Sequence, residues 1–146
     1  AGYYAQEHDN LRTDQSLLTN IRDAVPEGIN LGETQLRGLL GMFGLSGDKV
    51  FQESGTLSGG EKTKLALAML MVGRNNLLLL DEPTNNLDPP SRQAVADALV
   101  GWPGAIILVS HDEEFVRELA PTKVLLMPDG DVDYFSDDWL DLVSMS

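Results

Sequence analysis

The chain has 146 residues, 42% of them hydrophobic, and no cysteine, which suits a single domain of a reducing compartment such as the cytoplasm and excludes disulfides and thiolate metal sites. Its formal net charge is −13, from 10 basic and 23 acidic residues without a cluster of Lys and Arg, so we expect no direct binding of nucleic acid by this chain. The longest strongly apolar stretch, residues 65–72, is too short to span a bilayer, and the first residues lack a signal-peptide pattern.

The first part of the chain is predicted to be mainly helical. Residues 1–13 suit the end of a strand followed by a polar loop. The spacing of apolar residues then predicts one short helix over 16–24 and a second over 33–43. Glycines between these segments mark turns or helix ends. Residues 14–55 are therefore predicted to form a small helical layer.

After residue 55 the pattern changes to alternating helices and strands, which indicates an α/β fold with a largely parallel sheet. The four leucines at 77–80 predict a strand buried on both faces, because the run is short and lies between Asn75-Asn76 and Pro83. A C-terminal hairpin is predicted around the turn at 128–130, followed by a last helix. The predicted helices cover 58–72, 91–100, 112–119 and 137–144, and the predicted strands cover 77–80, 105–109, 123–127 and 132–135.

Residues 57–61 read Leu-Ser-Gly-Gly-Glu and mark the start of a helix. Ser58 and Glu61 have the spacing of a capping box, and the two glycines between them allow another backbone to come close. Free N–H groups at such a helix start attract anions. An ordinary capped helix would show the same pattern, so this motif alone does not identify a nucleotide site.

Two carboxylates follow the leucine run, where residues 81–83 read Asp-Glu-Pro. Ligand chemistry in open α/β sheets collects at the carboxyl ends of the strands. Asp81 suits a Mg²⁺ ligand and Glu82 suits a general base for an attacking water. A strand that runs into a polar turn would also explain these residues.

Two further motifs lie at element boundaries. Asp88 before Pro89 is typical of a helix start, and a simple N-cap role explains it equally well. His111 follows the second predicted strand in Ser-His-Asp, and a lone histidine is more often structural than functional.

Together, the order and spacing of Leu-Ser-Gly-Gly-Glu, Leu-Leu-Leu-Leu-Asp-Glu-Pro-Thr-Asn-Asn-Leu-Asp and Ser-His-Asp resemble the ATP-binding-cassette (ABC) ATPase family over essentially the whole chain. The resemblance implies a partial P-loop NTPase-like cassette with ATP and Mg²⁺ as cofactors. Its predicted parts are a Q-loop region at 1–13, a helical subdomain at 14–55 and, at 56–146, a core with the signature helix, Walker B motif, D-loop and H-loop.

The resemblance also implies roles for single residues. Gln6 matches the Q-loop glutamine, which contacts Mg²⁺ or water and links the core to the helical subdomain. Ser58, Gly59 and Gly60 of the signature would bind the γ-phosphate of a nucleotide held by a partner cassette, and Glu61 belongs to the same nucleotide site.

In the core, the resemblance implies that Asp81 holds Mg²⁺ and that Glu82 is the general base. Asp88 would communicate across a dimer of cassettes through the D-loop. His111 would contact the γ-phosphate as the switch.

Within the family, residues 57–67 and 81–88 look most like the ABC-F class, since transporter cassettes more often have Gln where Glu61 stands. Residues 3–8 and 133–135 suit the second cassette of such a protein. ABC-F proteins are soluble tandem cassettes, many of which act on the ribosome through an inter-cassette linker that this chain lacks. The motifs do not distinguish a translation factor from a ribosome-protection protein that confers antibiotic resistance. A transporter cassette with a membrane subunit, an SMC-like split cassette and a non-catalytic binding module are the alternatives.

The chain contains no P-loop of the form G-x-x-x-x-G-K-[ST]; Gly55 and Gly60 have the right spacing, but Glu61 occupies the lysine position. We therefore expect the P-loop to lie upstream and the chain to be a C-terminal fragment that neither binds ATP tightly nor hydrolyses it alone. Without that segment, apolar faces of the strands at 77–80 and 105–109 would be exposed, so self-association is expected.

Overall fold

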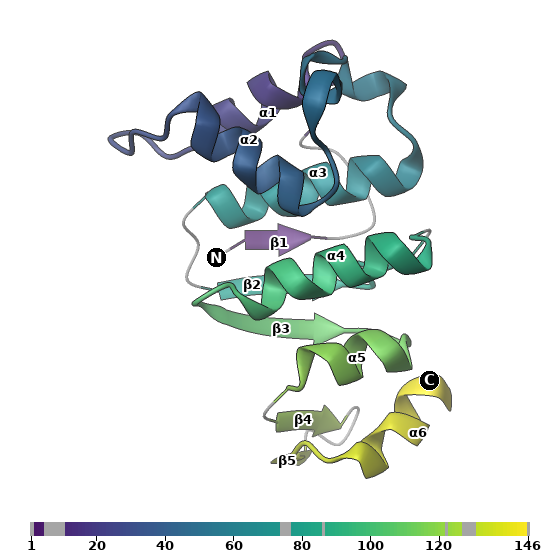
Figure 1. The fold of residues 1–146 in the computed structure, drawn as a ribbon. Helices are drawn as coiled ribbons and strands as arrows, with labels where there is room; N and C mark the ends of the chain where they lie inside the picture. The colour runs from purple at the N-terminus through teal and green to yellow at the C-terminus, as the bar shows by residue number, and fades with distance from the viewer. Residues whose placement is uncertain are drawn as a thin grey trace.

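The computed structural model describes residues 2–4, 11–73, 77–85, 87–121, 123–126 and 131–145. Three layers succeed one another along the molecule in Figure 1: a helical layer at the top, a parallel sheet with helices beside it in the middle, and a hairpin with the last helix at the bottom. This arrangement confirms the predicted α/β class. None of the described helices is long and apolar enough to cross a bilayer.

The helical layer contains α1 (Leu17–Ala24), α2 (Glu33–Met42) and α3 (Gly59–Val72), with 3₁₀ turns at Gly47–Phe51 and Ser54–Thr56 that the sequence did not predict. The Ser16 side chain caps α1 by accepting a hydrogen bond from the Thr19 N–H at 3.1 Å. Apolar side chains at helical spacing pack between the three helices, as the periodicity predicts. The apolar side chains of this layer with no exposed surface are Leu17, Ile21, Leu40, Phe43, Leu45, Val50, Leu65 and Ala68.

The central sheet contains three parallel strands in the order β1 (Gly2–Tyr4), β2 (Leu77–Asp81) and β3 (Ala105–Val109). Helix α4 (Pro89–Val100) follows β2, and α5 (Glu113–Leu119) follows β3. The register pairs Leu80 with Leu108 and Asp81 with Val109, so β2 and β3 end together. The predicted parallel sheet is therefore confirmed, and the strand ends bring the residues that follow them to one edge.

The prediction that β2 is buried on both faces is wrong for one face. Leu78 and Leu80 are buried in the same core cluster as Val95 and Leu99 of α4. On the opposite face Ile107 and Val109 of β3 are 54% and 55% exposed, and Leu77 and Leu79 of β2 are half-buried. The physical reason is that no helix among the described residues packs on that face. The expected exposure of apolar strand faces is thus confirmed on β3.

The last part of the chain forms an antiparallel hairpin of β4 (Lys123–Leu126) and β5 (Asp131–Tyr134), then a 3₁₀ turn at Asp137–Trp139 and α6 (Leu140–Met145). The predicted strands and final helix are confirmed. The predicted turn at 128–130 lies outside the described residues.

A backbone strap joins the start of the helical layer to the segment that leads into α3. The Ser54 N–H donates to the Gln15 carbonyl, and the Gly55 N–H donates to the Thr13 carbonyl, both at 2.9 Å. The buried Asn20 amide donates to the carbonyl of Arg12 at 3.1 Å and accepts from the Arg12 N–H at 2.9 Å. Because buried polar groups are costly when unpaired, these bonds fix the segment ahead of residues 57–61 against the chain that follows residue 10.

Gly55 is required by this strap, because a Cβ there would lie 2.9 Å from the Thr13 carbonyl oxygen. We predict that Gly55→Ala lowers the free energy of unfolding by about 1–3 kcal/mol, since the backbone must move to relieve the clash. Gly38→Ala is the matched control: it lies within α2, and its Cβ would meet no atom within 4 Å. That variant should gain about 0.5–1 kcal/mol from the lower entropy of the unfolded chain. Denaturant titration checks both signs, and a stabilising Gly55→Ala would contradict the close approach.

Candidate functional site

The predicted signature motif forms the first turn of α3. Ser58 is the N-cap, its hydroxyl accepts from the Glu61 N–H at 3.2 Å, and its own N–H donates to Glu61 Oε1 at 3.1 Å. The predicted capping box is therefore present. A Cβ at Gly59 would meet no atom within 4 Å, so the helix start is open to the approach of another molecule at this residue. Gly60 is half-buried in the same turn.

Glu61 also joins α3 to a 3₁₀ turn of the helical layer, a link that sequence analysis missed. Its second oxygen, Oε2, forms an ion pair with Lys49 from the 3₁₀ turn at Gly47–Phe51. The hydrogen bond from Lys49 lowers the pKa of Glu61, assisted by the bonds from Ser58 and opposed by partial burial. The sequence pointed to this pair only through a lysine in a segment for which no helix or strand was predicted.

Glu82 stands directly after β2, where its N–H donates to the Val109 carbonyl at 2.8 Å and prolongs the parallel ladder. Its φ is 48°, in the left-handed region that residues other than glycine adopt rarely. Such backbone strain concentrates at functional sites, where the surroundings hold it in place. The loop thus turns sharply at the residue that was predicted to be the general base.

Glu82 and His111 meet across the ends of β2 and β3. One carboxylate oxygen of Glu82 contacts His111 Nδ1, and the other accepts from the His111 N–H at 3.3 Å. The Glu82 side chain is 12% exposed and the His111 side chain 54% exposed, so the carboxylate is nearly enclosed while the imidazole faces solvent. The sequence predicted both residues, but not their contact.

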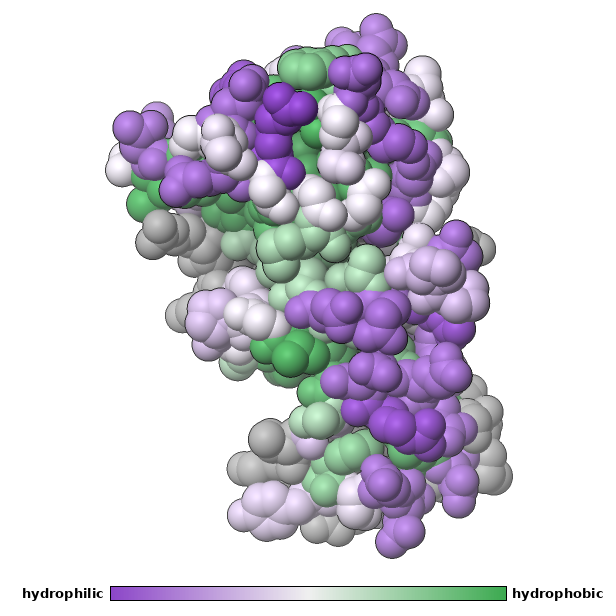
Figure 2. Space-filling model, viewed as in Figure 1, coloured by the Kyte–Doolittle hydropathy of each residue, from purple (hydrophilic) through white to green (hydrophobic). Residues whose placement is uncertain are grey.

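An open cleft of about 450 Å³ lies over this pair. In the view of Figure 2 the surface at the right, where the strands end, is mostly hydrophilic. The residues that line the cleft are Glu82, Thr84, Asn85, Leu87, Arg92, His111 and Asp112.

Asp112 connects three elements beside the cleft, and sequence analysis did not predict it as a site residue. Its Oδ2 accepts from the Thr84 hydroxyl at 3.1 Å and from Arg92 Nη1 at 3.0 Å, and its Oδ1 accepts from the Phe115 N–H at 3.2 Å. Burial alone would raise the pKa of Asp112, but the hydrogen bonds from Arg92, Phe115 and Thr84 outweigh it and lower that pKa. The signal was present in the sequence as the acidic residue after His111.

Asp81 is the last residue of β2 and is half-buried. Within the described ranges its carboxylate forms no hydrogen bond or ion pair. No group of three or more His, Cys, Asp or Glu side chains suited to a metal occurs among the described residues. This donor set fits Mg²⁺ bound with phosphate and water, which needs only one or two carboxylates. Gln6, the other predicted Mg²⁺ contact, lies outside the described residues.

Asp88 caps α4 by accepting from the Ser91 N–H at 2.9 Å, and its hydrogen bonds with Ser91 lower its pKa. Lys64 of α3 donates to the Ser91 hydroxyl at 3.3 Å. The N-cap interpretation of Asp88 is therefore correct, and the cap ties the predicted D-loop to the signature helix.

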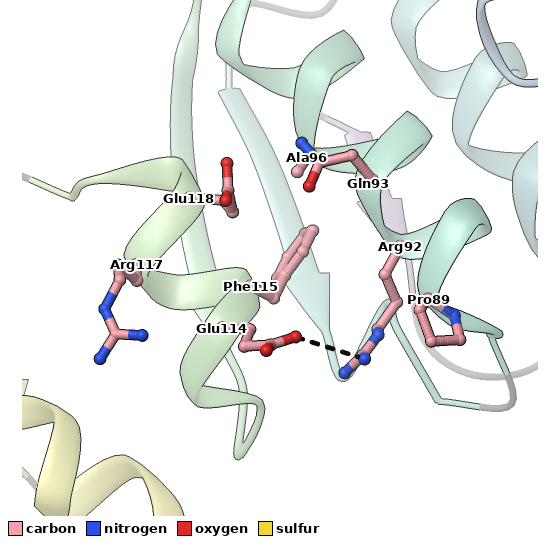
Figure 3. Close-up of a pocket in the computed structure, with 8 residues that line it drawn as sticks. All are labelled: Pro89, Arg92, Gln93, Ala96, Glu114, Phe115, Arg117 and Glu118. Carbon is pink, nitrogen blue, oxygen red and sulfur yellow. Dashed lines mark hydrogen bonds and ion pairs between the residues drawn. The ribbon is translucent and has the colours of Figure 1, made fainter.

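A second, smaller cleft of about 230 Å³ lies between α4 and α5. Figure 3 shows Phe115 at its centre, with Arg92 directed toward Glu114 on one side and Arg117 on the other. Arg92 borders both clefts, so one side chain links the site at the strand ends to the groove between the helices.

Comparison with known proteins gives the family. A family model described as "ABC transporter" matches residues 1–85, more than half of the chain. The chain belongs to the ABC family. The predicted family is confirmed.

Relatives of this ABC chain are named as ATP-binding proteins. "Probable ATP-binding protein YheS" of Haemophilus influenzae is 44% identical over 94% of the chain, which covers 21% of that protein. "Probable ATP-binding cassette sub-family F member 3 homolog" of Encephalitozoon cuniculi is 39% identical over 96% of the chain and is covered to 24%. The chain thus spans about a fifth to a quarter of the length of these relatives.

A solved structure confirms the predicted ABC-cassette fold. The dimeric post-hydrolysis state of the ATP-binding cassette MJ0796, bound to ADP and Pi, matches with a TM-score of 0.73 at 21% identity. The match covers 92% of the ABC chain and 62% of the solved one.

The ion pair of Lys49 with Glu61 predicts a pH-dependent contribution to stability. The pKa of Glu61 lies below its ordinary value of 4.5 in the folded state, so the pair stabilises the fold above that pH and the contribution is lost as pH falls through the lowered pKa. We predict that Lys49→Met lowers the free energy of unfolding at pH 7 by about 0.5 kcal/mol, because solvent screens this partly exposed pair.

The difference between the wild type and Lys49→Met should shrink when denaturant titrations are repeated below pH 4. The neighbouring Lys62→Met is the control and should show no such trend, because Lys62 forms no side-chain bond or ion pair within the described part of the chain. A difference that stays constant with pH would contradict the assignment of the pair.

Proposed function

We propose that the protein containing this chain binds and hydrolyses ATP, and that these residues supply its signature motif, general base and switch histidine. The observation that carries the proposal is the contact of Glu82 with His111, made from the ends of neighbouring parallel strands at an open cleft. Ligands of open α/β sheets bind at this edge. The relatives are named as ATP-binding proteins, which supports this function.

The chemistry follows from the two side chains. Glu82 is placed to accept the proton of a water that attacks the terminal phosphate. Its contact with Nδ1 orients the His111 ring and leaves Nε2 as the ring nitrogen available to a phosphate oxygen. Hydrolysis of this kind depends on positioning and charge stabilisation rather than on a covalent intermediate, which suits a site built from hydrogen-bonded loops.

Asp81 would hold Mg²⁺ together with Gln6, and the ion would neutralise charge on the phosphates when it is bound. The position of Asp81 at the end of β2, with no partner for its carboxylate among the described residues, supports this role. The 146 residues contain no P-loop, so in this proposal the lysine and backbone amides that cradle the phosphates come from another segment of the protein.

We further propose that two cassettes act together. Ser58, Gly59 and Gly60 would contact the γ-phosphate of a nucleotide held by the second cassette, with Glu61 in the same helix turn, and Asp88 would lie at the same interface. The open start of α3 at Gly59 supports an approach from outside. The cassette MJ0796, whose fold this chain shares, is dimeric with ADP and Pi bound.

Replacement of the proposed base gives the direct test. In the full-length protein, Glu82→Gln should lower Mg²⁺-dependent ATP turnover by about 10²–10⁴-fold, the usual contribution of a general base, and leave ATP binding intact. The bound state should accumulate as the closed pair of cassettes. Glu118→Gln on the exposed surface of α5 is the control and should keep the parental rate. Turnover of Glu82→Gln at the parental rate would exclude Glu82 as the base.

The work that ATP drives is proposed to be an ABC-F action on the ribosome, reached through regions outside this chain. Similarity to a sub-family F homologue supports this proposal, and so does the Glu at position 61. A transporter cassette is the second candidate, because the matching family model is described as an ABC transporter.

Fractionation of cells separates the two candidates. The Glu82→Gln form of the full-length protein, held in its ATP-bound state, should sediment with ribosomes. A wash in buffer without nucleotide should release it. Recovery with a membrane subunit after detergent extraction, and none with ribosomes, would favour the transporter role instead.

A further inference from the structure

We propose that Arg92 is a positioning residue of the ATPase site: acting through Asp112, it fixes the spacing between the loop that carries Glu82 and the loop that carries His111. This inference rests on the proposed function and names a residue that the family motifs do not include. Arg92 would touch neither the nucleotide nor the attacking water.

One carboxylate holds the two loops together. Asp112 Oδ2 accepts from Thr84, two residues after Glu82, while Asp112 itself follows His111 directly in the chain. The bond between Glu82 and His111 and the bond between Thr84 and Asp112 therefore run side by side across the same pair of loops. Thr84 is 6% exposed, so its hydroxyl has little water to replace Asp112 as a partner.

Arg92 supplies the charge that keeps Asp112 in place. Its Nη1 donates to Asp112 Oδ2 at 3.0 Å, and the side chains are only 29% and 15% exposed. A charge-assisted hydrogen bond is stronger than a neutral one, and an acid this enclosed is costly to leave without its cation. The second contact of Arg92, from Nη2 to Glu114 at 3.4 Å, reaches a side chain that is 76% exposed and contributes little.

The backbone that bears Arg92 is itself fixed. The Arg92 N–H donates to the Asp88 carbonyl at 2.9 Å in the first turn of α4, whose cap is the Asp88 side chain. Lys64 of α3 donates to Ser91 in the same turn. Through Asp112, Arg92 thus anchors the loop of His111 to the capped start of α4.

The hydrogen bonds that link Arg92, Asp112 and Thr84 have a function beyond stability because Glu82 has a strained backbone, with φ at 48°. Such a conformation persists only where its surroundings determine it. Loss of Arg92 would leave Asp112 Oδ2 without its cation and weaken its bond to Thr84, although the Phe115 N–H still holds Oδ1. The carboxylate of Glu82 would then lose its fixed relation to His111. Misplacement of a catalytic group lowers turnover without lowering the affinity for substrate.

The test uses steady-state ATPase kinetics of the full-length protein with four variants. Arg92→Met removes the cation, Asp112→Asn keeps the shape of its acceptor, and the third variant combines both. Arg117→Met is the matched control: it is the same substitution at the other arginine of the groove in Figure 3, whose partner is Glu113 alone within the described chain.

Arg92→Met should lower kcat by about 10- to 100-fold with less than about a twofold change in KM for ATP, the signature of a misplaced group. Arg117→Met should stay within about twofold of wild type in both constants, as expected for an exposed pair. In the Asp112→Asn background, Arg92→Met should have little further effect, because residues that act through one another are not additive.

Three results would overturn the inference: an unchanged kcat for Arg92→Met, a full additional loss in the Asp112→Asn background, or an equal loss in Arg117→Met. If Arg92→Met does not fold, Thr84→Val tests the same set of hydrogen bonds by removing only the Thr84 hydroxyl. An unchanged kcat in that variant would also overturn the inference. Failure of the proposed function looks different: the wild-type protein would then show no ATP turnover that Glu82→Gln abolishes.

Discussion

The parallel pairing of β2 with β3 is the constraint on which the site depends. Because the two strands end in register, with Asp81 opposite Val109, the loops that leave them start side by side. The hydrogen bond from the Glu82 N–H to the Val109 carbonyl extends this pairing by one residue and places the Glu82 carboxylate against His111. A shift of one residue in the register would turn the acidic side chains to the other face of the sheet.

The starts of three helices also fix residues of the candidate site. Three of the motif acids and hydroxyls, Ser58, Asp88 and Asp112, cap α3, α4 and α5. Capping satisfies N–H groups that the helix leaves unpaired, so these residues stabilise local structure whatever else they do. The structural interpretation of each motif and its functional interpretation are therefore compatible, and the same bonds that begin a helix also fix the edge of the cleft.

Sequence alone predicted the order of helices and strands, because apolar periodicity and caps are local signals: Ser16, Ser58 and Asp112 stand at helix starts in the structure. It did not predict contacts between distant segments. The pairing of Lys49 with Glu61 and of Arg92 with Asp112 joins residues 12 and 20 positions apart, on elements whose mutual placement no local pattern encodes. The half-buried face of β2 at Leu77 and Leu79 was misjudged in the strand prediction for the same reason, since burial depends on which elements pack against a strand.

The left-handed backbone at Glu82 also constrains how this position can vary. Side chains branched at Cβ are disfavoured there, whereas Asn and Gly adopt that region readily. A side chain at residue 82 must therefore first fit the left-handed backbone, and only then does its acidity matter for the site. Loss of activity in a Val or Ile variant would reflect a displaced loop. Only an unbranched side chain of the same length tests the loss of the carboxylate by itself.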